Sequence, residues 1–315
     1  MPVRSISTTR SATRRSLLAT AGSLAAGALV LAGCGSDSLS GAPQEGAATG
    51  GATPAATVEA DPALTAMLPQ SVQDSGVLRV GTNAEYAPNE FLQGQEIVGM
   101  DIDLMDAVAA KLGVEARYEN AGFDTLITGV QGNRYDAAIS SFTVNAERLQ
   151  QVNMVQYFNA GTQWAVREGN PDGIDPENAC GASVAVQSGT TQADDDLPAR
   201  QQACADAGQP AIDVVPFGSQ QDAAAALAQG RVQAMLADSP VTAYAVQQTE
   251  GLELAGDIYD AAPYGIVVPL EGTDTAEAIS QALQAIAEEG AYTAAVEAWG
   301  AEDGAVDEFP VNPAS

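Results

Sequence analysis

From residue 77 onward, short apolar runs alternate with stretches of helical periodicity, and this alternation restricts the chain to the α/β class. In a β-α-β-α order, neighbouring strands run mostly parallel and are joined by right-handed crossovers. The first half of the pattern predicts strands at 77–80, 114–118 and 136–140, with helices at 101–112 and 123–131.

The same pattern restarts further along the chain. It predicts strands at 162–167, 181–187, 212–216, 232–237 and 264–268. Helices are expected from Thr190, at 219–229, from Pro240 behind Ser239, and as one long or broken segment at 275–299. A chain of 315 residues is long enough for two cores. We therefore expect two α/β lobes, the second inserted into the first, without an exact internal repeat.

The charge balance excludes several classes of function. The chain has 41 acidic and 12 basic residues and no histidine. Such an acidic surface repels phosphate backbones, so we expect no nucleic-acid partner. Without histidine there is no Ser-His or Cys-His catalytic pair, and the commonest zinc ligand is missing. We expect no metal and no cofactor.

The N-terminus is typical of an export signal. Residues 1–16 are rich in arginine, and residues 17–33 form an apolar run that is short for a membrane span. The ending Leu31-Ala32-Gly33-Cys34 resembles a bacterial lipoprotein processing site, which predicts that Cys34 carries the lipid (palmitate) after cleavage. An ordinary cleaved signal is the alternative. The pair Arg14-Arg15 leaves Sec and twin-arginine export both open.

Small and polar residues dominate the segment from Cys34 to residue 71. This composition predicts a flexible tether that holds the protein at the outer side of the cell membrane, with folded structure starting near Val72. The two cysteines that remain, Cys180 and Cys204, flank a predicted strand and the helix after it. A disulfide is expected in an extracellular protein, and two buried free thiols are the alternative.

Four polar stretches follow predicted strands, at the edge where open α/β sheets bind ligands. The stretches are 81–91, with Tyr86, Pro88 and Phe91; 140–143, followed by Arg148; 187–191; and Asp238. Taken singly, each has a structural explanation: Thr191 and Asp238 can cap helices, and Arg148 can lie on the surface. Together they supply a cation for a carboxylate, an anion for an ammonium, hydroxyls and aromatic rings. This set predicts a free α-amino acid as ligand.

From residue 77 to 300 the chain closely resembles the solute-binding proteins, family 3, of bacterial polar amino-acid ABC importers. The matching stretches are Leu78-Arg79-Val80-Gly81-Thr82, residues 98–104, Ser140-Ser141-Phe142-Thr143 with Arg148, residues 187–192, Ala237-Asp238-Ser239-Pro240 and Pro263-Tyr264-Gly265-Ile266. The resemblance implies the type II periplasmic-binding-protein fold, in which two lobes joined by two hinge strands close on one ligand. Here lobe 1 would comprise residues 72–160 and 264–310, lobe 2 residues 161–263, and the hinges 159–162 and 255–263.

The resemblance also implies roles for individual residues. Tyr86 and Phe123 would form the walls against which the ligand side chain packs. The carboxylate would be held by Ser141, Thr143, Arg148 and Thr191, and the amino group by Ser140 and Asp238, with Gln187 also in the site. The family usually has phenylalanine where this chain has Asn89, so Asn83, Glu85 and Asn89 are candidate specificity residues. Glutamine, glutamate and a basic amino acid all remain open as ligands.

The leading function is therefore a lipid-anchored, monomeric binding protein that passes an amino acid to a membrane permease and its ATPase, without catalysis of its own. The first rival is an enzyme on the same fold, resembling the cyclohexadienyl (arogenate) dehydratases. It would need a general acid, for which Glu85, Glu90 and Asp238 are available. The second rival is a sensory ligand-binding domain.

Overall fold

The computed structural model describes residues 58–314 of the chain. The predicted signal peptide, the lipidation site Cys34 and the first part of the predicted tether lie outside the described residues. Within residues 58–314 none of the helices has the length and apolar character needed to cross a membrane.

Ordered structure begins before Val72, so the predicted end of the tether at residue 71 is corrected. Helices α1 (Pro62–Thr65) and α2 (Gln70–Ser75) precede the first strand. Leu64 and Leu68 are buried in the same core as the strands and helices that follow. Two leucines anchor this polar segment, whereas its overall composition predicted that it would not pack.

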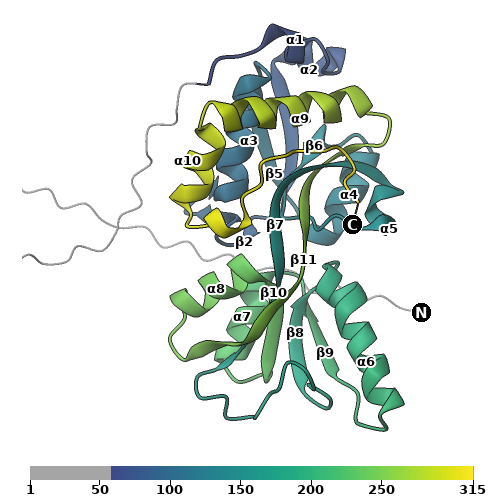
Figure 1. The fold of residues 1–315 in the computed structure, drawn as a ribbon, viewed down its shortest axis with the longest axis vertical. Helices are drawn as coiled ribbons and strands as arrows, with labels where there is room; N and C mark the ends of the chain where they lie inside the picture. The colour runs from purple at the N-terminus through teal and green to yellow at the C-terminus, as the bar shows by residue number, and fades with distance from the viewer. Residues whose placement is uncertain (1–57, 315) are drawn as a thin grey trace, which may run out of the picture. The chain divides into compact units, whose positions relative to one another are not determined.

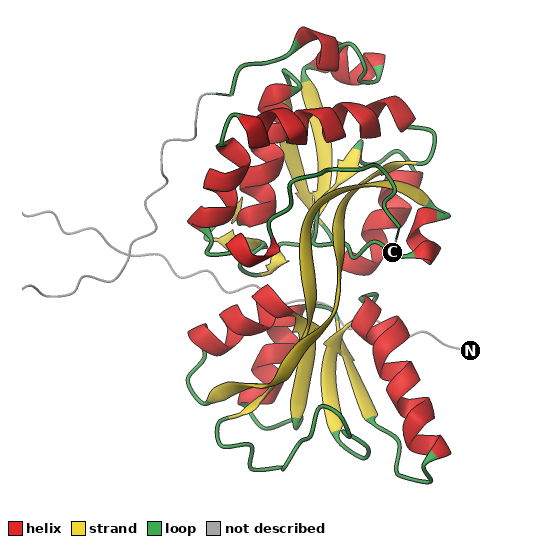
Figure 2. Ribbon diagram, viewed as in Figure 1, coloured by secondary structure: helices red, strands yellow, loops and turns green. Residues whose placement is uncertain are grey.

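Eight strands form one sheet in the order β5-β1-β6-β11-β7-β10-β8-β9. The predicted α/β class is confirmed, because β5, β1 and β6 pair in parallel, as do β10, β8 and β9 (Figures 1 and 2). The strands are β1 (Val77–Thr82), β5 (Glu115–Asn120), β6 (Ala137–Ala138), β7 (Val152–Arg167), β8 (Ser183–Gln187), β9 (Asp213–Phe217), β10 (Ala234–Asp238) and β11 (Leu252–Pro269).

Strands β7 and β11 pair antiparallel along almost their whole length and serve both halves of the sheet. One end of β11 pairs with β6, and the far part of β7 pairs with β10. Figure 1 shows the two strands side by side, passing from the elements around β5 and β6 to those around β8 and β9. The pairing register shifts between Ala255 and Tyr259 and again between Tyr259 and Ala262. The predicted hinges, residues 159–162 and 255–263, lie inside these two strands. The two strands therefore connect the two halves of the sheet, and each half belongs to one lobe.

Each lobe has its own hydrophobic core. In lobe 1, which contains β1, β5 and β6, the largest core includes Leu78, Leu104 and Ile279; in lobe 2, which contains β8 to β10, it includes Trp164 and Val184. The flanking helices are α3 (Met100–Lys111), α4 (Phe123–Gln131), α6 (Leu197–Asp206), α7 (Gln220–Ala228), α8 (Ser239–Gln248), α9 (Thr273–Glu288) and α10 (Ala291–Ala298).

Several short elements were not predicted. A separate three-stranded sheet is formed by β2 (Glu85–Tyr86), β3 (Glu90–Gln93) and β4 (Glu96–Val98). The other short elements are α5 (Ala146–Leu149) and a 3-10 turn η2 (Glu302–Gly304), whereas the helix expected from Thr190 is observed as a π-helical turn η1 (Gln192–Asp196) that continues into α6. These segments are too short to show a periodic sequence pattern, so tertiary contacts decide their conformation.

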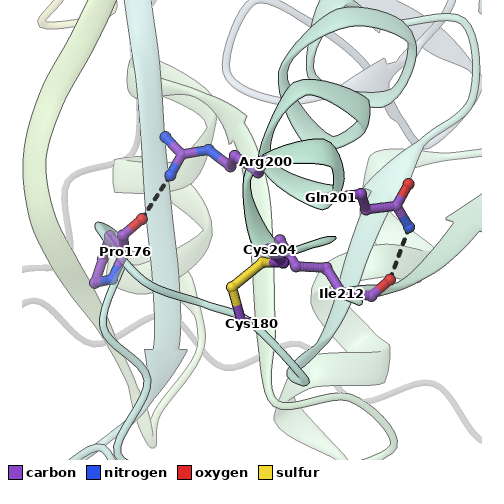
Figure 3. Close-up of a disulfide and its surroundings, with 6 residues drawn as sticks. All are labelled: Pro176, Cys180, Arg200, Gln201, Cys204 and Ile212. Carbon is purple, nitrogen blue, oxygen red and sulfur yellow. Dashed lines mark hydrogen bonds between the residues drawn. A yellow bond between two sulfur atoms is a disulfide. The ribbon is translucent and has the colours of Figure 1, made fainter. Parts of the chain in front are cut away.

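The expected disulfide between Cys180 and Cys204 is present, with 5.6 Å between the two Cα atoms. It joins the loop before β8 to α6 (Figure 3). Two hydrogen bonds hold the same helix on either side: Arg200 Nη1 donates to the carbonyl of Pro176 at 2.6 Å, and Gln201 Nε2 donates to that of Ile212 at 2.7 Å. The disulfide and these two hydrogen bonds together hold α6 against the lobe 2 sheet.

Candidate functional site

A small cavity of about 10 Å³ lies where the two lobes meet. All nine residues proposed from the sequence as ligand contacts line it, together with Thr190 and Gln192, which the sequence interpretation missed. Both of these residues lie in the stretch 187–192 that carries part of the family resemblance, so the sequence did contain a signal for them. The lining residues are Tyr86, Phe123, Ser140, Ser141, Thr143, Arg148, Gln187, Thr190, Thr191, Gln192 and Asp238.

Arg148 supplies the positive charge of the cavity. It lies on α5, a single turn that begins after Asn145, whose side chain accepts a hydrogen bond from the Arg148 N–H at 2.8 Å. The guanidinium is buried and donates to the carbonyls of Thr143 at 2.7 Å and Gly189 at 3.1 Å. Burial lowers the pKa of Arg148 from its usual value. Among residues 58–314 it forms no ion pair within 4.0 Å, so a buried cation faces the cavity without a carboxylate partner.

Asp238 supplies the negative charge from the other lobe. It is the last residue of β10 and is 6% exposed. Its two carboxylate oxygens accept hydrogen bonds from Tyr86 Oη and Gln192 Nε2, both at 2.8 Å. Burial raises the pKa of Asp238 above its usual value. Its side chain makes no capping hydrogen bond to α8, which argues against helix capping as its role.

Ser140 and Ser141 form the lobe 1 wall between these charges. They follow β6 in a loop where Ser141 has a left-handed φ of 53°. Ser140 Oγ accepts from the Asn83 N–H at 3.1 Å and donates to Glu90 at 2.8 Å. The N–H of Ser141 donates to Asp101 Oδ2 at 2.9 Å. Both serines are therefore held by acids that lie behind the cavity wall.

The polar loop after β8 forms the lobe 2 wall. Thr190 Oγ1 donates to the carbonyl of Gln187 at 2.8 Å, and Gly189 has a φ of 79°. Thr191 makes no side-chain capping hydrogen bond to the π-helical turn after it, so its hydroxyl is not used as a cap. Gln187 Nε2 donates to Asn83 Oδ1 at 2.8 Å, a contact that crosses between the lobes.

The three candidate specificity residues do not line the cavity. Asn83 is buried and also donates to the carbonyl of Ala121 at 2.9 Å. Asn89 is fully buried and donates to Ser141 Oγ at 2.8 Å, so it supports a wall residue from behind. Glu85 is half-buried on β2. The amide of Asn89 therefore binds a residue inside lobe 1 and does not make the ligand pocket more polar.

A second cavity adjoins the first and shares Phe123, Arg148, Thr190 and Thr191 with it. Its further lining is markedly acidic, and no lysine and no other arginine is among the residues that line it. The acids are Asp124, Glu147, Asp194 and Asp195. A positively charged group in this space would be attracted by four carboxylates.

Residues 78–302 match the family model of the bacterial extracellular solute-binding proteins, family 3. The chain belongs to this family. The match spans both lobes and every residue that lines the cavity, so the predicted family and the two-lobed fold are confirmed.

Relatives of this chain include proteins that are named for the amino acid they bind. The "arginine-binding protein ArgT" of Corynebacterium glutamicum is 37% identical over 253 residues, which is 80% of this chain and 83% of that protein. A solved structure titled "an ancestral arginine-binding protein bound to arginine" has 33% identity and a TM-score of 0.66, and covers 71% of this chain and 98% of the other. A second structure, of an ancestral arginine-binding protein bound to glutamine, has 32% identity and a TM-score of 0.65, with coverage of 72% and 98%.

Proposed function

We propose that this chain is an extracellular binding protein that captures L-arginine between its lobes and delivers it to an ABC importer. The observation that carries the proposal is the pair of buried, opposite charges in one cavity, Arg148 from lobe 1 and Asp238 from lobe 2. A free amino acid has a carboxylate and an ammonium on the same carbon. Arg148 would bind the first group and Asp238 the second.

Closure of the lobes would depend on the ligand for an electrostatic reason. A charge that leaves water loses solvation energy unless it finds a partner. With a zwitterion between them, Arg148 and Asp238 both gain that partner. Phe123 and Tyr86 would form the apolar faces for the side chain, and hydroxyls of Thr143 and Thr191 would add donors to the carboxylate.

The choice of arginine rests on two further observations. The relatives described above are named for arginine, and the cavity that adjoins the binding cavity carries Asp124, Glu147, Asp194 and Asp195. Four carboxylates favour a cationic side chain and disfavour glutamate. Glutamine is the nearest competitor, because one of the similar structures has it bound.

We also propose that the chain has no catalytic activity. Of the three acids considered for an enzyme, only Asp238 lines the cavity; Glu85 and Glu90 do not. Asp238 already accepts hydrogen bonds from Tyr86 and Gln192, which suits a binding carboxylate. At the membrane, we propose that the lipid on Cys34 retains the protein beside its permease and ATPase; the Leu31-Ala32-Gly33-Cys34 ending supports this.

Isothermal titration calorimetry with arginine, glutamine and glutamate tests the ligand. We expect arginine to bind at least tenfold more tightly than glutamine, and glutamate to bind most weakly. Equal affinity for arginine and glutamate would refute the argument from the acidic cavity. Failure of all three to bind would refute the proposed ligand class.

A further inference from the structure

Two acids meet in the interior of lobe 1, directly behind the serines of the cavity wall. Glu90 begins β3 and Asp101 lies in the first turn of α3; both are 0% exposed. Both carboxyls are within hydrogen-bond distance of Ser141 Oγ, Glu90 Oε2 at 3.3 Å and Asp101 Oδ2 at 3.4 Å. Within the described part of the chain neither acid forms an ion pair, so no cation compensates them.

The hydrogen bonds around these acids leave one atom without a donor. Asp101 Oδ2 accepts from the Ser141 N–H at 2.9 Å and from Tyr157 Oη at 2.8 Å. Glu90 Oε1 accepts from Ser140 Oγ at 2.8 Å. Asp101 Oδ1 is buried and has no donor among the described residues. A proton on Glu90 would supply the missing donor, because a protonated carboxyl donates one hydrogen bond.

The surroundings favour retention of that proton. Burial and the neighbouring charge of Asp101 raise the pKa of Glu90 well above its usual range, and burial raises the pKa of Asp101 to about 6. The titratable groups that face the pair from β2, β5 and β7 are the phenols of Tyr86, Tyr118 and Tyr157, whose own pKa values burial raises. These phenols stay neutral, and Asp103 on α3 adds only negative charge. Two adjacent buried carboxyls without a cation therefore ionise one at a time.

The pair also decides what the Ser140 hydroxyl can offer to the cavity. A hydroxyl has one proton and two lone pairs. In Ser140 the proton is donated to Glu90 and one lone pair accepts the Asn83 N–H. Only a lone pair remains for a ligand, so Ser140 can accept a hydrogen bond but cannot donate one. Ser141 is constrained in the same way, because its N–H and its hydroxyl both face the acids.

We propose that Glu90 and Asp101 share a single proton and act as positioning residues, which keep Ser140 and Ser141 as acceptors for the ammonium group of the ligand. The ligand half of this inference rests on the proposed function, whereas the shared proton does not. In this arrangement Ser141 donates no hydrogen bond to the carboxylate of the ligand. The donors for that carboxylate are then Arg148, Thr143 and Thr191.

Infrared spectroscopy of the purified chain tests the shared proton without any ligand. At pH 7 we expect a C=O band of a protonated carboxyl that is lost in Glu90→Gln. The matched control is Asp238→Asn, which removes the buried acid of the cavity and should leave the band in place. A wild-type spectrum without the band, or a band lost in Asp238→Asn but kept in Glu90→Gln, overturns the proposal.

The pH dependence of unfolding is a second, independent measurement. The folded state holds a proton on Glu90 that the unfolded state releases above its ordinary pKa, so stability falls as pH rises towards the raised pKa. This proton changes the folding equilibrium constant by up to about tenfold per pH unit. We expect Glu90→Gln to remove that slope between pH 5 and 8, and Glu85→Gln, the same change on a half-buried side chain, to keep it. Equal slopes in both variants overturn the proposal.

Binding of L-arginine tests the positioning role. Glu90→Gln retains an acceptor for Ser140 and a donor for Asp101, so its affinity at pH 7 should stay within about threefold of the wild type. Glu90→Ala frees the Ser140 proton and should weaken binding at least tenfold. Unchanged binding in Glu90→Ala overturns the positioning role. If the wild type does not bind arginine, the proposed ligand fails while the infrared result still decides the shared proton.

Discussion

Replacement of Arg148 by alanine removes the only arginine or lysine among the described residues that line the cavity. Arg148 is 8% exposed, so a bound carboxylate would be shielded from water and would depend on this side chain for its partner. Loss of one member of a buried, hydrogen-bonded charge pair costs about 2–5 kcal/mol. That cost corresponds to roughly 30-fold to several thousand-fold in the dissociation constant.

The structure places Arg148→Ala in the upper part of this range. Arg148 also donates to the carbonyl of Gly189 in the other lobe at 3.1 Å, so the variant loses a contact that favours closure. A hydrogen bond to a charged group contributes about 1.5–3 kcal/mol. Arg148→Lys should recover only part of the loss, because an ammonium cannot form the two parallel hydrogen bonds of a guanidinium with a carboxylate.

Calorimetric titration with L-arginine provides the measurement, and Arg134→Ala provides the matched control. Arg134 pairs with Glu119 on the exposed surface of lobe 1, where an ion pair contributes about 0–1 kcal/mol, so its loss should not affect binding. If Arg148→Ala binds arginine within about threefold of the wild type, less than 1 kcal/mol, the assignment of the carboxylate site is refuted.

Asp238→Ala should weaken the binding of every amino acid by a factor similar to that of Arg148→Ala. Thr191→Ala should weaken binding less, because only a neutral hydroxyl is lost. Calorimetric titration of both variants checks this order of affinities, and the reverse order would contradict it. Cys34→Ala should release the protein from the membrane fraction while it still binds ligand, and retention in that fraction after a salt wash would contradict the lipid anchor. We expect the double variant Cys180→Ser, Cys204→Ser to have a free energy of unfolding lower by about 3 kcal/mol, because the disulfide closes a loop with a sequence separation of 24. An unchanged midpoint of urea unfolding would contradict this expectation.

Much of the fold follows from local patterns that the sequence displays directly. The predicted helix at 123–131 coincides with α4, and the long segment at 275–299 is broken into α9 and α10 at Gly290, which has a φ of 83°. The full extent of β7 and β11 was not predicted. Each strand continues through a hinge from one lobe into the other, and the sequence pattern revealed only one part of each, residues 162–167 of β7 and 264–268 of β11. Pairing of distant segments, not local preference, decides where such strands begin and end.

The sequence by itself determined the α/β class and the family, favoured the disulfide, and identified most of the residues that line the cavity, without Thr190 and Gln192. These conclusions depend on residue types and on order along the chain, which the sequence displays. Only the tertiary structure decided which residue contacts which. Asn89 reaches Ser141 and not the cavity, Gln187 reaches Asn83 across the lobes, and Glu90 and Asp101 meet behind the cavity wall. Contacts between residues far apart in the chain depend on how strands and loops are brought together in space, and burial at those contacts sets the charge and proton of each group.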